Sequence, residues 1–210
     1  MRIIELLGLS RSGKTTLTRK LVKSLRSEGY KTAVFERPDI DFRRLGDMAK
    51  FHELYFKSME RGYQQALSDQ MDLLVYDRGF IDRKIMLALD TQEGTIDSDF
   101  SASLFKKLKR QIELTDYAFL LSVHPKVSIS RIDSQRSQGL DNSHLCTGMN
   151  TREDPEELTR LIHEYNRIKD ENPRIIVING EAPKGKVYKK VRSVIKRKLN
   201  GDKKKQRCTK

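Results

Sequence analysis

The chain has 210 residues, of which 37% are hydrophobic and 34% charged, and its formal net charge is +13 at pH 7. This length suits one α/β domain, and no apolar run approaches the roughly 20 residues that a transmembrane helix needs. The two cysteines, Cys146 and Cys208, are too few for a disulfide framework or a zinc site. We therefore expect a cytoplasmic protein without a membrane span or a signal peptide.

Apolar runs rich in β-forming residues alternate with helical patterns, which is typical of a parallel sheet built from βαβ units. The predicted strands span residues 2–9, 31–36, 72–77, 117–123 and 174–179. The predicted helices span residues 13–27, 47–68, 81–89, 98–114, 126–135, 155–170 and 184–199.

The most specific motif lies between the first strand and the first helix. Residues 8–15 read GLSRSGKT, a complete G-x-x-x-x-G-K-T loop. Its glycines let backbone N–H groups surround an anion at a helix N-terminus, where the helix dipole is also positive. We predict that Lys14 reaches the β- and γ-phosphates of a nucleoside triphosphate and that the Thr15 hydroxyl completes a Mg²⁺ shell. The predicted nucleotide-binding residues are Gly8, Ser10, Arg11, Ser12, Gly13, Lys14, Thr15, Thr16 and Arg131.

Charged residues also end the second and third predicted strands. Glu36 and Arg37 precede a proline after the second strand, and Asp77 and Arg78 follow the third. Ligands of open parallel sheets bind at the carboxyl ends of the strands. We therefore predict that Asp77 is a Mg²⁺ ligand and that Arg78 holds an acceptor phosphate. The alternatives are an exposed turn at Glu36 and a structural ion pair between Asp77 and Arg78.

A polar, aperiodic segment at residues 137–153 indicates a loop that closes over the site. Arg131 and Arg136 precede it, and Arg152 lies within it. Phosphoryl transfer requires positive charge on the moving group and protection from water, and an arginine-bearing lid would supply both. A helix-surface charge is the competing interpretation for Arg131.

The excess charge is confined to the C-terminal end. Residues 184–210 contain 13 Lys or Arg and one acidic residue, so the other 183 residues carry 29 basic and 28 acidic groups. A solvated helix followed by a basic, disordered tail at residues 201–210 is the simpler interpretation. An extension that binds RNA, a membrane or a protein partner stays open.

Taken together, these motifs resemble the thymidylate kinase group of P-loop nucleoside and nucleotide kinases. The residues that carry the resemblance are Thr15, Pro38, Asp77, Arg78, His124, Pro125, Arg131 and Arg136. The resemblance implies a three-layer P-loop NTPase fold, with a five-stranded parallel sheet in the order 2-3-1-4-5. It also implies a kinase domain at residues 1–200 with a lid at about 131–153, ATP as the phosphoryl donor, and Mg²⁺.

Residue roles also follow from this resemblance. Arg11 stands where one subgroup presents a catalytic arginine to the transferring phosphate, and Arg136 would be the lid arginine. The predicted catalytic residues are Lys14, Arg11, Arg78, Arg136 and Glu36. The chain also departs from the family pattern: Glu36 precedes Arg37 where many members have the reverse order, and Ser10 replaces an expected aspartate. Residues 51–56 read FHELYF where a base-reading asparagine-arginine pair is expected.

Two acceptors are compatible with these residues. A nucleoside hydroxyl must lose a proton, for which Glu36 could be the base. A monophosphate needs cations instead, and Arg37 and Arg78 meet that need. We favour the monophosphate. A third hypothesis is an ATPase or switch associated with nucleic acid through its basic C-terminus.

The expected partner is a small nucleotide acceptor. A homodimer is compatible with the sequence, a nucleic-acid partner is not favoured, and a membrane partner is not expected. Phe51, Tyr55, Met59 and Tyr63 recur every four residues, which fits a base-stacking wall or, more simply, a core stripe.

Overall fold

Five parallel strands form a single sheet in the order β2-β3-β1-β4-β5, which confirms the predicted fold class and strand order. The computed structural model describes residues 1–36, 38, 40, 45–138 and 155–208, with side chains up to residue 199. The strands are β1 (Arg2–Leu7), β2 (Thr32–Phe35), β3 (Leu73–Asp77), β4 (Tyr117–Ser122) and β5 (Ile175–Asn179). The helices are α1 (Lys14–Ser27), α3 (Met48–Ser68), α4 (Phe80–Gln92), α5 (Ser98–Glu113), α6 (Pro125–Ser137), α7 (Pro155–Glu171) and α8 (Lys184–Cys208).

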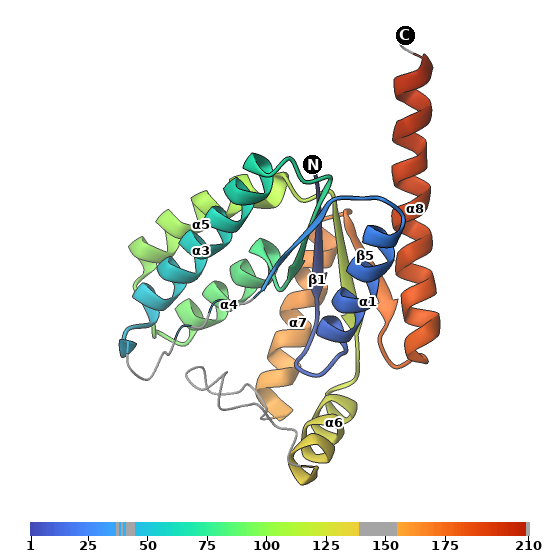
Figure 1. Ribbon diagram of the computed structural model, residues 1–210. Coiled ribbons are helices and arrows are strands. Elements are labelled where there is room, and N and C mark those ends of the chain that lie inside the picture. Colours follow the sequence, from blue (N-terminus) through green and yellow to red (C-terminus); the bar gives the residue numbers. More distant parts are fainter. Residues whose placement is uncertain (37, 39, 41–44, 139–154, 209–210) are drawn as a thin grey trace.

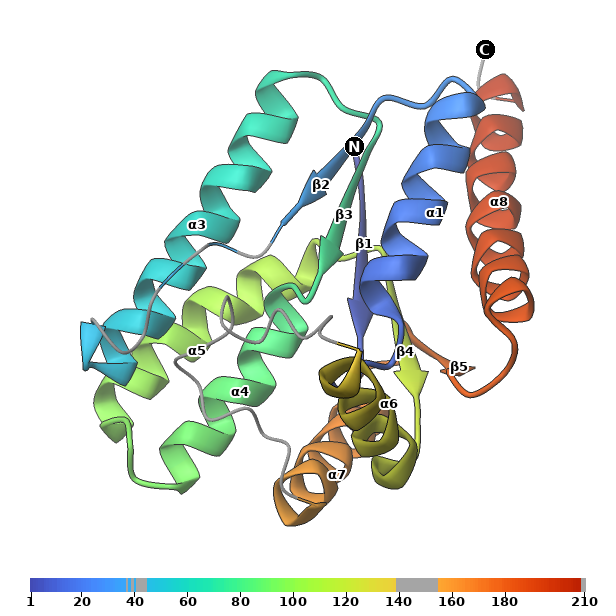
Figure 2. The ribbon, with the colours of Figure 1, turned by 60° about the horizontal axis from the view of Figure 1, so that its bottom comes forward.

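Helices cover both faces of the sheet (Figures 1 and 2). On one face α1 and α8 pack on the sheet through a core that includes Ile4 and Leu6 of β1. On the other face, Ile3 packs with α3, α4 and α5, and Leu7 packs with α4 and α7. Successive side chains of a strand point to opposite faces, so the apolar run of β1 supplies both cores. The three-layer architecture follows directly from this alternation.

Strand register brings the predicted site residues to one edge of the sheet. Leu6 of β1 lies opposite Asp77 of β3, and Phe35 of β2 lies opposite Tyr76. The segments that follow β1, β2 and β3 therefore leave the sheet side by side at its carboxyl edge. The phosphate loop begins there at Gly8, so donor and acceptor groups can meet at this edge.

The C-terminal helix is longer than the sequence predicted. Its expected end was near residue 199, but α8 continues to Cys208, through residues that were predicted to be a disordered tail. Residues 203–207 are Lys, Gln and Arg, which are good helix formers, and no proline follows Gly201 to stop the helix. Residues 209–210 lie outside the described part of the chain. Among the described helices, none is long and apolar enough to cross a bilayer.

Candidate active site

The phosphate loop joins β1 to α1 and presents an open helix N-terminus. Gly8 has a φ of 132°, and a Cβ at this position would lie 2.6 Å from the backbone oxygen of Leu121. Only glycine fits both demands. Among the described residues, no side chain caps α1, whose N-cap is Gly13, and its first turn has no acidic residue. The first N–H groups of α1 are thus available to an anion.

Lys14 lies folded against its own loop. Its Nζ donates to the backbone oxygens of Gly8 (2.9 Å) and Leu9 (2.6 Å) and to Ser12 Oγ at 3.3 Å. Burial and the positive charge of Arg78 together lower the pKa of Lys14 to about 7, although the negative charge of Asp77 opposes them. An incoming phosphate would favour the ammonium form, because an opposite charge within a few ångströms stabilises it. An anion bound in the loop would therefore raise the pKa of Lys14 and favour its charged form.

Thr15 and Asp77, the two predicted Mg²⁺ ligands, are in contact. Thr15 Oγ1 donates a hydrogen bond of 2.6 Å to Asp77 Oδ2, which joins the start of α1 to the end of β3. Mg²⁺ prefers oxygen ligands and takes one or two protein groups, with phosphates and water completing its shell. Within the described residues no group of three or more His, Cys, Asp or Glu side chains could hold a metal ion. The pair therefore fits a Mg²⁺ ion shared with bound phosphates.

Two of the arginines predicted to be catalytic have left-handed backbone conformations. Arg11 has a φ of 55° and Arg78 a φ of 69°, and Gln70 is the third non-glycine residue with positive φ in the described chain. Such a conformation is uncommon for long side chains and clusters at functional sites.

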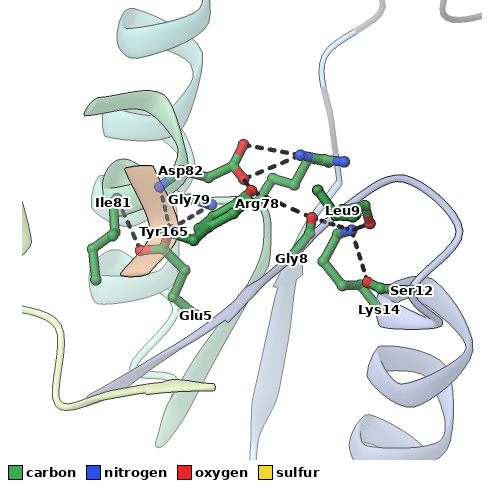
Figure 3. A network of polar contacts seen from close by, with 10 residues as sticks. All are labelled: Glu5, Gly8, Leu9, Ser12, Lys14, Arg78, Gly79, Ile81, Asp82 and Tyr165. Carbon is green, nitrogen blue, oxygen red and sulfur yellow. Dashed lines mark hydrogen bonds and ion pairs between the residues drawn. The ribbon is translucent and has the colours of Figure 1, made fainter. Parts of the chain in front are cut away.

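Arg78 is fixed by a buried polar network that Figure 3 shows. Arg78 Nη1 lies 3.1 Å and 3.3 Å from the two carboxylate oxygens of Asp82. The Tyr165 hydroxyl of α7 donates a short hydrogen bond to Asp82 and lies 3.3 Å from the Gly8 oxygen. Burial alone would raise the pKa of Asp82, but Arg78 and Tyr165 hold it below its ordinary value. The network thus links an ionised Asp82 to both Arg78 and the phosphate loop.

Glu5 holds the start of α4 from the neighbouring strand. Its carboxylate accepts from the backbone N–H groups of Gly79, Ile81 and Asp82 at 2.9–3.2 Å. A Cβ on Gly79 would lie 2.8 Å from the Glu5 carboxyl carbon, so only glycine permits this approach. Burial raises the pKa of Glu5 to about 8, although the three N–H donors oppose that shift. Glu5 therefore positions the helix turn that carries Asp82.

Helix α6 is attached to the phosphate loop by two side chains. Ser128 Oγ donates to the Ser10 oxygen at 2.6 Å. Arg131 donates to the oxygens of Arg11 (3.2 Å) and Gly180 (3.3 Å). The predicted contact of Arg131 with nucleotide stays a prediction, because these bonds attach it to backbone. Arg136 is exposed in the last turn of α6.

Several predicted residues lie at the edge of the described site. Glu36 directly follows β2 and is exposed; the β2–β3 register ends one residue earlier, at Phe35 opposite Tyr76. Thr16 is exposed in the first turn of α1. Arg37 and the segment 139–154, which includes most of the predicted lid and Arg152, lie outside the described residues. Their predicted roles therefore stay predictions.

The aromatic stripe of α3 forms core. Phe51, Tyr55 and Met59 are at most 2% exposed and pack in the same apolar cluster as Phe35 and Tyr76. The simpler of the two interpretations offered by the sequence is therefore the one that these contacts support. Sequence reasoning did not find Glu5, Asp82 or Tyr165. Glu5 could have been found as the only acid within the apolar first strand, and Asp82 as an acid four residues after Arg78.

The site combines an open helix N-terminus, a lysine folded into the phosphate loop, a Thr–Asp oxygen pair and several arginines. These features are typical of a P-loop phosphotransferase of the three-layer α/β class. The model of the thymidylate kinase family matches residues 6–191. The chain therefore belongs to the thymidylate kinase family. Membership makes it a nucleotide kinase and implies ATP as the phosphoryl donor.

Solved structures with a similar fold include deoxyadenosine kinase from M. mycoides. The complex with dCMP and dCDP has 20% identity and a TM-score of 0.67, over 95% of this chain and 99% of that one. The dATP complex has 19% identity and a TM-score of 0.64, over 94% of this chain and 99% of that one. At this identity the likeness establishes the shared fold. None of the curated protein sequences is significantly similar to this chain.

Proposed function

We propose that this protein transfers the γ-phosphoryl group of ATP to a nucleoside monophosphate. One observation carries the proposal: Arg78, at the end of β3, is held by Asp82 at the carboxyl edge of the sheet, where its charge acts on Lys14 in the phosphate loop. A monophosphate acceptor is an anion that approaches the anionic donor. Cations that face both phosphates offset this repulsion and orient the acceptor.

Each residue then has a defined task. The α1 N-terminus and Lys14 bind the donor phosphates, Arg11 stabilises the transferring group, and Arg78 binds the acceptor phosphate. Thr15 and Asp77 would hold Mg²⁺, which neutralises charge on the donor phosphates when it is bound. No protein base is needed, because the acceptor oxygen of a monophosphate is already ionised.

A second candidate is transfer to the hydroxyl of a deoxynucleoside. The fold shared with a deoxyadenosine kinase favours it, as does the position of Glu36 directly after β2, at the sheet edge where β3 ends in Asp77. Glu36 would then be the general base. Glu36 precedes Arg37, whereas many family members have the arginine first. This reversed order also argues against a standard thymidylate site.

Steady-state assays separate the two candidates. ADP formation from ATP and Mg²⁺ is measured with each of the four deoxynucleosides and with each of their monophosphates, dTMP first. We expect turnover of a monophosphate, abolished in Lys14→Ala and weakened through the acceptor KM in Arg78→Ala. Turnover of nucleosides alone, with loss of activity in Glu36→Gln, would establish the second candidate instead.

A further inference from the structure

Helices α1 and α8 lie side by side on one face of the sheet (Figure 2), and both carry many exposed Lys and Arg side chains. We call the exposed Lys and Arg side chains of residues 19–26 and 184–198 the α1/α8 surface. It contains four such side chains from α1 and seven from α8. The only acidic residue on either stretch or directly beside it is Glu28, which pairs with Arg192. The surface is thus almost purely cationic.

The two helices pack against each other, so their exposed cations form one continuous surface. Val187, Val191 and Ile195 of α8 pack into the same core as Leu17 and Leu21 of α1. Lys20 Nζ lies 4.6 Å from the ring centre of Tyr188, which brings the cations of both helices close together. Helix α8 then continues beyond the end of α1 to Cys208 (Figure 1). Its 25 residues span about 37 Å.

This surface lacks the features on which apolar protein interfaces, membrane-inserted helices and single-strand binding sites depend. The exposed large hydrophobic residues of the described chain are Met1, Leu67, Leu114 and Val177, none of which lies on α1 or α8. A protein interface needs an apolar centre, and insertion into a membrane needs an apolar helix face. Binding of single strands relies on exposed aromatic rings, whereas Tyr188 is half-buried beneath Lys20.

A duplex phosphate backbone needs none of these features. Neutralisation of phosphates by Lys and Arg releases counterions, and this term alone supports sequence-independent binding. The residues before position 184, which include the four cations of α1, carry 29 basic and 28 acidic groups, so the net positive charge of the chain comes from its C-terminal part.

We propose that the α1/α8 surface binds the phosphate backbone of duplex nucleic acid without sequence preference. None of the residues in the polar network around Arg78 that Figure 3 labels belongs to this surface. This binding therefore does not rest on the identity of the kinase acceptor.

The test is fluorescence anisotropy of the full chain with a labelled 20-base-pair duplex of DNA or RNA over a series of salt concentrations. The variant Lys189→Glu/Lys190→Glu/Arg197→Glu reverses three exposed charges of α8. The matched control Lys106→Glu/Lys107→Glu/Lys109→Glu reverses three exposed charges of α5. Both variants change the net charge equally, and none of these residues belongs to the catalytic site.

We expect the wild type and the α5 control to bind duplexes with a steep salt dependence. The α8 variant should bind at least tenfold more weakly, and the loss of three contacts should reduce its salt slope by about 2.7. Equal weakening by both variants would overturn the proposal, because net charge would then explain the binding. So would an absence of binding at low salt, or competition by anionic phosphatidylserine vesicles but not by unlabelled duplex.

Discussion

Removal of the Tyr165 hydroxyl tests how the acceptor arginine is positioned. Tyr165 is 2% exposed, and its hydroxyl donates to Asp82, the carboxylate that in turn holds Arg78. Burial and the negative charge of Asp82 hold the pKa of Tyr165 well above its ordinary value, so the hydroxyl stays a donor at neutral pH. Tyr165→Phe keeps the ring in the core and deletes only this donor.

The size of the effect follows from the bond that is lost. A hydrogen bond to a charged group contributes about 1.5–3 kcal/mol, so we expect Tyr165→Phe to lose about 2 kcal/mol of unfolding free energy. For a chain of 210 residues this lowers Tm by about 4–8 °C. If about 1.4 kcal/mol of this loss weakens the binding of the acceptor to Arg78, because Asp82 no longer holds Arg78 in place, the acceptor KM rises about tenfold. The KM for ATP should change less than twofold.

Thermal unfolding and steady-state kinetics provide the two readouts, with Tyr188→Phe as the control for loss of a hydroxyl away from the site. The acceptor is whichever one the wild type phosphorylates. A lower Tm with an unchanged acceptor KM would show that Tyr165 has only a structural role and would refute the positioning argument. An equal rise in the KM values of both substrates would also refute it.

Four further changes probe the rest of the site. Lys14→Ala should reduce transfer at least a thousandfold, as measured by ADP formation, because charge on the γ-phosphoryl group is lost; a folded variant with tenfold loss or less would contradict this role. Arg11→Ala should lower kcat about a hundredfold and leave ATP affinity by calorimetry nearly unchanged; a pure rise in the KM for ATP would move Arg11 to ground-state binding. Arg78→Ala should raise the acceptor KM at least tenfold, whereas unchanged kinetics would make its contact with Asp82 purely structural. Glu5 has its pKa raised to about 8, so the folded state retains a proton that the unfolded state releases between pH 4.5 and 8. The wild type should therefore lose stability across that window, as followed by urea unfolding, and Glu5→Gln should not; parallel pH profiles would reject the assignment.

Local pattern was sufficient to predict the strands and helices of the sheet and to single out the candidate donor residues. The apolar run of β1, the loop from Gly8 to Thr15 and the acid that ends β3 are each readable within a few residues, and strand order follows from the family resemblance. The pairing of Thr15 with Asp77 follows as well, because parallel strands end at one edge.

The acceptor half depends on contacts that no local pattern encodes. Asp82 and Tyr165 are 83 positions apart, and Glu5 meets Gly79 across 74 positions. A buried tyrosine on α7 has the same sequence signature as an ordinary core residue, so its hydroxyl could not be assigned a role. The end of α8 was missed for another reason: charge composition indicates solvation, but it does not stop a helix.

The central claim is that the phosphate loop binds a triphosphate whose outer group passes to a nucleotide across the cleft. The most direct measurement follows the label from γ-³²P-ATP, incubated with Mg²⁺ and the four deoxynucleoside monophosphates, by separation of the products. The account predicts labelled nucleoside diphosphate, absent with Lys14→Ala. Label found only in inorganic phosphate, or retained in ATP by well-folded protein, would contradict it.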